Sequence, residues 1–496
     1  MPKTLMLERV SPELSAEEFF AKYISKRRPV ILTGLVDDVA FQGRNWTDLN
    51  YLARKAGDVE VMVEPIHPTA NQYGTDVERV PTTFRDFLAA LRVEEGPHPY
   101  LTTQYSEDDP DAETVFPPPT NALKDEFPIV PRIMGNLFLQ QVNLWLGRSK
   151  DGSSSGLHHD FHDNIYCLLK GRKRFVLFPP SEVKHLYPYG TLVARHPNGL
   201  ISYEDIPVRA DGLSKRAACK ARVRALELKI DALKRRSKGK GKAKNHSKEM
   251  KALMDAHDEA LDELAEAALD EHEGDDEVDD FDALMSGLDD LDDIGDGPSG
   301  SGKGAHEGDE EEEEEEWRGI GHSDDDADDE DADDDADGED SDEEEEEGLG
   351  GGKAGPTEPS SFSRIATAHL HQHLGIPTTA VLPETYSPAD FPGLKKTTEP
   401  YVVELSEGEM LYLPASWWHE VTSTSTGDVH MAFNYWFYPP DALDNFGAPY
   451  SDTLVWDYLR GKGAVEGGSR EPEEQTTGGK RARESVGGGP SKKSRR

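Results

Sequence analysis

The spacing of apolar residues changes several times along the chain, and each change marks a different kind of structure. Over residues 1–135 the spacing alternates between helical and extended, and Ser15 followed by Glu18 matches a capping box that begins an amphipathic helix. Residues 138–178 instead form successive short strand-like runs, with a turn at 170–172. The pattern therefore predicts a mixed α/β segment followed by a β-rich segment.

The strand pattern stops for a long interval and resumes near Tyr401. Within the interval, residues 215–269 are rich in alanine, leucine and charged residues at helical spacing, which predicts one or two surface helices. We therefore expect one β domain that is split by an insertion. If residues 210–361 are left out, the separation of Asp160 from His419 falls from 259 to 107 residues, a length that one small β barrel can span.

Most of the negative charge lies in one segment of the insertion. The chain carries a formal net charge of −44, and residues 271–347 hold 41 acidic residues against Lys303 and Arg318, which gives this segment −39 and leaves −5 elsewhere. With almost no large apolar residues, the segment cannot bury enough surface to offset the entropy of ordering. We expect it to be solvated and extended by its own repulsion, and the folded part to be nearly neutral.

The composition also indicates the cellular compartment in which the protein is expected. Cys167 and Cys219 are too few for a disulfide framework, and neither the N-terminal ten residues nor any later stretch has the apolar length of a signal or membrane segment. We expect a soluble protein in a reducing compartment. Basic clusters at 480–483 and 492–496 resemble a bipartite nuclear import signal, although solubilising tails also carry such clusters. This predicts a nuclear protein and leaves the cytoplasm open.

A candidate metal site combines a short motif with a distant histidine. In an extended chain His158 and Asp160 point to one side while His159 points away. His419 ends a turn, a strand and a proline-led corner that begin at Gly408. Two imidazoles and one carboxylate on one face of an octahedron are the ligands of Fe(II) oxygenases. Taken separately, the motif also fits a hydrogen-bonded surface pair, and His419 also fits an ordinary aromatic core.

Four runs near the motif carry a further signal: residues 142–147, 156–167, 171–175 and 177–180. They resemble the JmjC-type, cupin-fold 2-oxoglutarate oxygenases. The resemblance is strongest to the small JmjC-only protein hydroxylases of the lysyl hydroxylase type, and weaker to the asparaginyl hydroxylase that acts on hypoxia-inducible factor. It covers residues 15–205 and 398–440, but neither the insertion nor the tail.

The resemblance implies a mainly β fold with flanking helices, a double-stranded β-helix of the jelly-roll or cupin type, interrupted by a long disordered acidic insertion. The expected parts are an N-terminal α/β part (1–135), the first half of the β-helix (136–209), a charged helical insertion (210–270), the disordered acidic insertion (271–361), the second half of the β-helix (362–460) and a disordered basic tail (461–496).

The same resemblance implies a metal site and a co-substrate site. His158, Asp160 and His419 would bind Fe(II), and no catalytic residue beyond these ligands is expected. Lys173 would pair with the distal carboxylate of 2-oxoglutarate, since a lysine is a compact cation that suits one buried carboxylate. Judged by its neighbours Arg172 and Arg174, Lys173 also fits a surface lysine of a hairpin.

Further positions match the surroundings of the family's metal and co-substrate less specifically. These positions are Ser155, Tyr100, Asn164 and Asn434. Tyr100 also fits a plain aromatic on a strand face. Three other histidines have no ligand role in the motif, and we expect them to face outward or to lie behind the ligands: His159, His162 and His430.

The implied function is that of an Fe(II)- and 2-oxoglutarate-dependent dioxygenase that hydroxylates a protein side chain with O2. Much of the histone-demethylase branch has glutamate where this chain has Asp160, which favours hydroxylation. Alternatives are a histone N-methyl-lysine demethylase, a tRNA-base hydroxylase and a non-catalytic module that binds histones or other basic proteins. The acidic insertion predicts basic protein partners. We expect no membrane and no direct nucleic-acid contact, because the acidic segment would repel phosphate, and a homodimer is left open.

Overall fold

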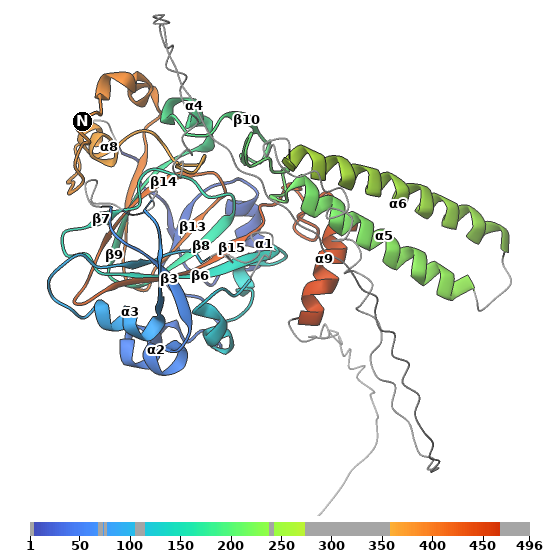
Figure 1. Ribbon diagram of the computed structural model, residues 1–496, viewed down its shortest axis with the longest axis horizontal. Helices are drawn as coiled ribbons and strands as arrows, with labels where there is room; N and C mark the ends of the chain where they lie inside the picture. Colours follow the sequence, from blue (N-terminus) through green and yellow to red (C-terminus); the bar gives the residue numbers. More distant parts are fainter. Residues whose placement is uncertain are drawn as a thin grey trace, which may run out of the picture. The chain divides into compact units, whose positions relative to one another are not determined.

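Two sheets form the body of the protein, shown in Figure 1 as a computed structural model that describes residues 4–67, 73, 77–104, 115–237, 243–272 and 358–466. The larger, nine-stranded sheet has the order β1 (Arg9–Val10), β2 (Val30–Leu32), β13 (Met410–Leu413), β8 (Asp163–Lys170), β15 (His430–Phe437), β6 (Leu139–Gly147), β5 (Tyr100–Leu101), β3 (Glu60–Glu64) and β4 (Val80–Thr83). The four-stranded sheet has the order β12 (Tyr401–Leu405), β9 (Arg172–Phe178), β14 (Trp418–Thr424) and β7 (Ser153–Ser154).

Strands from the two sides of the insertion alternate within both sheets. In the larger sheet β8 lies between β13 and β15, and in the smaller sheet β9 lies between β12 and β14, all paired antiparallel. Neither half of the chain can therefore complete a sheet without the other. This interleaving is the arrangement of a double-stranded β-helix, so the fold predicted from the sequence is confirmed.

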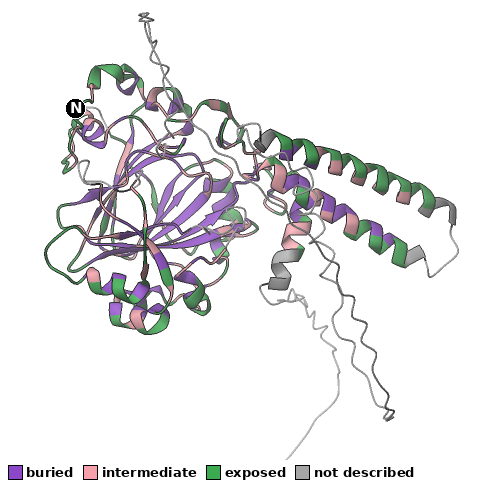
Figure 2. Ribbon diagram, viewed as in Figure 1, coloured by how far each residue is buried: buried purple, intermediate pink, exposed green. Residues whose placement is uncertain are grey.

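Side-chain alternation along β9 explains how the smaller sheet is buried on both faces. Phe175 and Leu177 belong to the apolar cluster between the two sheets. Val176 and Phe178 belong to a second cluster on the outer face of this sheet, together with Leu370. Because neighbouring strand residues point to opposite faces, one run of apolar residues serves both clusters. Figure 2 shows that most residues of the central strands are buried, whereas the helices of the insertion have exposed sides.

The helices cover the sheets and form part of the insertion. They are α1 (Ala16–Phe19), α2 (Leu49–Ala56), α3 (Phe84–Ala90), α4 (Val183–Leu186), α5 (Lys215–Ser237), α6 (Ala243–His272), α8 (Thr367–Leu374) and α9 (Thr453–Glu466). Helix α1 begins at the predicted capping box, where Ser15 Oγ accepts from the backbone N–H of Glu18 at 3.2 Å. Helices α5 and α6 confirm the helices predicted for residues 215–269. No helix in the described part of the chain is long and apolar enough to cross a membrane.

Two predicted boundaries were wrong. Ser360 and Ser361, assigned to the disordered insertion, are buried, and the N–H of Gly190 donates to the carbonyl of Ser360 at 3.1 Å. Helix α9 reaches Glu466, beyond the expected start of the tail at residue 461. In the sequence, the polar residues around Ser360 look like a continuation of the acidic low-complexity segment. The residues that they hydrogen-bond to are distant in sequence, so the sequence alone does not show that this stretch is folded. The acidic tract and the basic clusters of the tail lie outside the described residues.

We expect Trp46→Ala to lower the free energy of unfolding by about 3–5 kcal/mol. Trp46 is fully buried against the ring of Phe433, with ring centroids 5.1 Å apart, and its Nε1 donates to Glu126 at 2.8 Å. Chemical denaturation measures the loss. Val39→Ala is the control, because Val39 is 97% exposed and should change stability by less than about 0.5 kcal/mol. Equal unfolding midpoints for the two variants would show that this core is misassigned.

Candidate metal centre

Three side chains from distant parts of the chain meet at the end of the β-helix. His158 and His419 face each other across a short antiparallel bridge, in which each backbone N–H donates to the other residue's carbonyl, at 3.0 and 2.7 Å. Their ring centroids are 4.3 Å apart, and His419 Nε2 lies 3.6 Å from Asp160 Oδ2. One ligand atom from each of the three residues lies within 4.8 Å of the other two.

Backbone carbonyls orient both imidazole rings. Nδ1 of His158 lies 3.0 Å from the carbonyl of Gly156, and Nδ1 of His419 lies 2.9 Å from the carbonyl of Trp417. A proton on each Nδ1 satisfies these contacts and leaves both Nε2 lone pairs free for a metal. Burial, followed by the nearby His419, lowers the pKa of His158 to about 4, so this ring is neutral near pH 7, as a ligand must be.

The donor set fits a ferrous ion. Two imidazole nitrogens and one carboxylate oxygen on one side of an octahedral ion leave three coordination positions open, which is the arrangement of non-haem Fe(II) oxygenases. In the described ranges these three residues are the one group of three or more histidine, cysteine or acidic side chains with ligand atoms close enough to hold an ion.

A buried lysine lies in the wall of the same cavity. Lys173 is 1% exposed, and its Nζ donates to Ser423 Oγ at 2.5 Å and to the Tyr100 hydroxyl at 3.3 Å. Burial lowers the pKa of Lys173 to about 7. No carboxylate of the described residues forms an ion pair with Lys173. A buried lysine whose hydrogen-bond partners are hydroxyl groups can accommodate an anion beside it.

The other predicted positions divide into those that line the cavity and one that does not. Ser155, Tyr100 and Asn164 line it together with the metal ligands. Asn434 lies behind Asn164, donating from Nδ2 to the Asn164 side-chain oxygen at 3.0 Å while its own oxygen accepts from Trp145 Nε1 at 2.9 Å. Asn434 therefore does not line the cavity but supports Asn164, a residue that does.

Ser423 is a cavity residue that the sequence analysis missed. It lies directly opposite Lys173 in the pairing of β14 with β9. Its position four residues after His419 on one strand, hence on the same face, was the available signal. A lone serine in a run of serines and threonines carries no apolar pattern that would single it out.

The three extra histidines line no part of this cavity. His159 is buried rather than outward-facing, with Nε2 2.8 Å from the hydroxyl of Tyr203. His162 stacks on Trp436, with ring centroids 5.6 Å apart. His430 is 1% exposed and packs against the ring of Tyr100.

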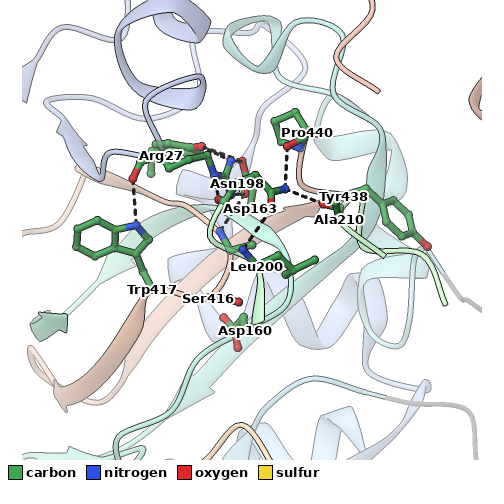
Figure 3. Close-up of polar contacts among 12 residues, drawn as sticks. Arg27, Asp160, Asp163, Asn198, Leu200, Ala210, Ser416, Trp417, Tyr438 and Pro440 are labelled. Atoms are coloured by element: carbon green, nitrogen blue, oxygen red, sulfur yellow. Dashed lines mark hydrogen bonds and ion pairs between the residues drawn. The ribbon is translucent and has the colours of Figure 1, made fainter. Parts of the chain in front are cut away.

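A buried ion pair holds the corner that carries the third metal ligand (Figure 3). Arg27 binds both oxygens of the Asp163 carboxylate, at 2.5 and 2.7 Å. The same carboxylate accepts from the Tyr412 hydroxyl at 2.8 Å and from the backbone N–H of Ala415 at 2.9 Å. The indole N–H of Trp417 donates to the carbonyl of Arg27 at 3.1 Å. One carboxylate thus joins the N-terminal part, the start of β8 and the corner.

The corner also contacts the ligand segment directly. The backbone N–H of Ser416 donates to the carbonyl of Asp160 at 2.7 Å, and its Oγ accepts from the N–H of Ile201 at 2.9 Å. Ser416 has φ 60°, a left-handed conformation that costs free energy for any residue except glycine and persists where surrounding contacts impose it. These contacts hold the corner in place next to the carboxylate ligand.

A double-stranded β-helix with a group of two histidines and one aspartate at its end, close enough to hold a metal ion, is the arrangement of the cupin class. The chain belongs to the JmjC-type, cupin-like family, since the family's cupin-like domain matches residues 16–443. Members of this family are typically 2-oxoglutarate-dependent oxygenases.

Relatives with assigned names extend the comparison. JmjC domain-containing protein 4 of Schizosaccharomyces pombe is 34% identical over 90% of this chain and 88% of its own length. tRNA wybutosine-synthesizing protein 4 of Neurospora crassa is 34% identical over 35% of this chain and 14% of its own length. Lysine-specific demethylase JMJ30 of Arabidopsis thaliana is 28% identical over 38% of this chain and 41% of its own length. The similarity over nearly the whole chain is therefore to a JmjC-domain protein.

We expect Asp163→Asn to lower the free energy of unfolding by about 3–5 kcal/mol, because it leaves the buried charge of Arg27 without its partner. Thermal and chemical unfolding measure the change. Asp58→Asn is the matched control: it breaks another arginine–aspartate pair, Arg85–Asp58 at 2.6 Å, in which the aspartate is 93% exposed. The control should cost less than about 1 kcal/mol. Equal losses in the two variants would contradict a structural role for the buried pair.

Proposed function

We propose that this protein is an Fe(II)- and 2-oxoglutarate-dependent dioxygenase that hydroxylates a protein side chain. The observation that carries the proposal is the pairing of two features in one cavity. The cavity is lined at once by the ligands His158, Asp160 and His419 and by the buried cation Lys173. A dicarboxylate that chelates a metal at one end requires a cation at the other.

Each group has a defined task in this mechanism. The two histidines and Asp160 hold the ferrous ion from one side and leave its other side open. Lys173, with Ser423 and Tyr100, binds the distal carboxylate of 2-oxoglutarate. When bound, iron and 2-oxoglutarate supply the oxidation of an unreactive C–H bond by O2, with succinate and carbon dioxide as co-products. The protein orients the reactants and excludes water, and needs neither a nucleophile nor an acid–base pair.

Two features favour hydroxylation of a protein over the alternative reactions: the charge of the chain and the aspartate among the three ligands. The folded part is nearly neutral and the insertion strongly acidic, which disfavours a tRNA substrate and favours a basic protein. Aspartate at position 160 favours hydroxylation over demethylation through the resemblance noted above. One relative is named a lysine-specific demethylase and another a tRNA wybutosine-synthesizing protein, so both chemistries are outcomes that the experiment must separate.

We expect the full-length protein, given iron, 2-oxoglutarate and a cell lysate, to produce succinate and protein peptides that gain one oxygen, as detected by untargeted mass spectrometry. His158→Ala should reduce both products to background because it removes a metal ligand. His185→Ala, a histidine on α4 that does not line the cavity, should leave both unchanged. Loss of methyl groups from lysines would identify a demethylase. The absence of succinate with every substrate would identify a binding module.

We expect the affinity for 2-oxoglutarate to fall as pH rises above 7. Without ligand, Lys173 loses its proton through a pKa of about 7, well below that of a free lysine, and only the protonated form attracts the dianion. The linked loss approaches about tenfold per pH unit. Calorimetric titration with Mn2+ in place of iron measures it.

Lys173→Met should weaken binding by at least about 30-fold and remove this pH dependence. Lys170→Met is the control, because Lys170 lies three residues away and outside the cavity lining. Unchanged affinity in Lys173→Met would contradict the co-substrate assignment and leave the metal site standing.

A further inference from the structure

The segment that contains the metal ligand His158 is paired on both of its edges. On one edge it faces His419, and on the other it faces Phe362, in two isolated antiparallel bridges. The N–H of Ser363 donates to the carbonyl of Leu157 at 2.8 Å, and the N–H of His159 donates to the carbonyl of Ser361 at 3.1 Å.

Residues 360–364 are held on their far side as well. The N–H of Tyr189 donates to the carbonyl of Phe362 at 2.9 Å, and the N–H of Arg364 donates to the carbonyl of Tyr187 at 2.9 Å. This short extended stretch is therefore fixed between the ligand segment and the chain after α4. Its backbone position leaves the Phe362 side chain over the ligand.

The ring of Phe362 stacks on the ring of His158. Their centroids lie 4.8 Å apart with an interplanar angle of 13°, whereas the ring of His419 meets the other histidine at 56°. Among the residues that the structure describes, the His158 ring has one polar contact, from Nδ1 to the carbonyl of Gly156. This contact fixes one atom but still permits the ring plane to tilt about it. A flat ring stacked on the imidazole restricts this tilt.

We infer that Phe362 is a positioning residue for the metal ligand His158, an inference that rests on the proposed metal site. Phe362 holds the plane of the imidazole so that Nε2 points at the ion. Phe362 lies just after the acidic insertion, 204 residues beyond His158 in the sequence. The residues after the insertion thus supply a ligand, His419, and also the support for the ligand that precedes the insertion.

The test compares two bulky replacements in the full-length protein. Phe362→Tyr keeps a flat ring, and we expect its dissociation constant for Mn2+ to stay within about twofold of the wild-type value. Phe362→Leu keeps apolar bulk without a stacking face, and we expect the constant to rise about tenfold, the lower end of the range for residues that support metal ligands. The electron paramagnetic resonance signal of free Mn2+ measures binding without turnover, and thermal unfolding measures the fold.

A matched control comes from a later part of the chain that follows the insertion. Phe391 also stacks on an aromatic ring, that of Tyr386, with centroids 5.1 Å apart and an interplanar angle of 7°, but contacts no metal ligand. Phe391→Leu should leave Mn2+ affinity unchanged.

Three outcomes overturn the inference in distinguishable ways. If Phe362→Leu binds Mn2+ as the wild type does while His158→Ala does not, Phe362 has no positioning role and the metal site stands. If His158→Ala itself keeps its affinity for Mn2+, the metal site and the proposed function both fail. Weaker binding by Phe391→Leu, equal to that of Phe362→Leu, would assign the effect to general loosening and would also overturn the inference.

Discussion

The antiparallel register of β9 with β14 is the constraint on which the site depends. It places His419 opposite Leu177 and Ser423 opposite Lys173. Because side chains alternate along a strand, His419 and Ser423 both face the cavity, the first at the metal end and the second at the buried lysine. A slip of one residue would turn both to the outer face of the sheet. A single strand pairing thus sets the two ends of the site at once.

Two buried basic side chains, Arg27 and Lys173, differ in whether an acidic partner lies beside them. Arg27 meets both oxygens of Asp163, so its charge is neutralised within the fold. Lys173 has hydroxyl partners but no acid among the described residues, and its pKa falls to about 7 as a result of burial. A buried charge without a partner destabilises a fold. The proposed anionic co-substrate would supply that partner, and Lys173 lines the same cavity as His158, Asp160 and His419.

The fold accommodates a long insertion without losing its site. Closing a longer loop costs little, about 0.6 kcal/mol for each doubling of its length, whereas the interleaved strands are held by many backbone hydrogen bonds. Helix α5 of the insertion contacts α9 near the end of the chain, and residues 360–364 pair with the ligand segment as soon as the chain returns. The insertion therefore begins and ends next to parts of the folded domain, and the residues that follow it pair with the segment of His158.

The sequence by itself determined the features that depend on residues close together in the chain, such as helices, strands and the side to which a residue points. Alternation in an extended chain was enough to place His158 and Asp160 on one side. The turn, strand and corner that end at His419 suggested the distant ligand, and the resemblance to a family gave the three residues a common role. Only the tertiary structure decided that Asn434 lies behind the cavity, that Ser423 lies opposite the lysine and that Phe362 lies on the ligand ring. The physical reason is that periodicity reports which face of an element is buried, whereas the partner of each face depends on pairing between distant strands. The spacing of apolar residues gives no information about which polar residues pair between strands, so these contacts cannot be predicted from the sequence.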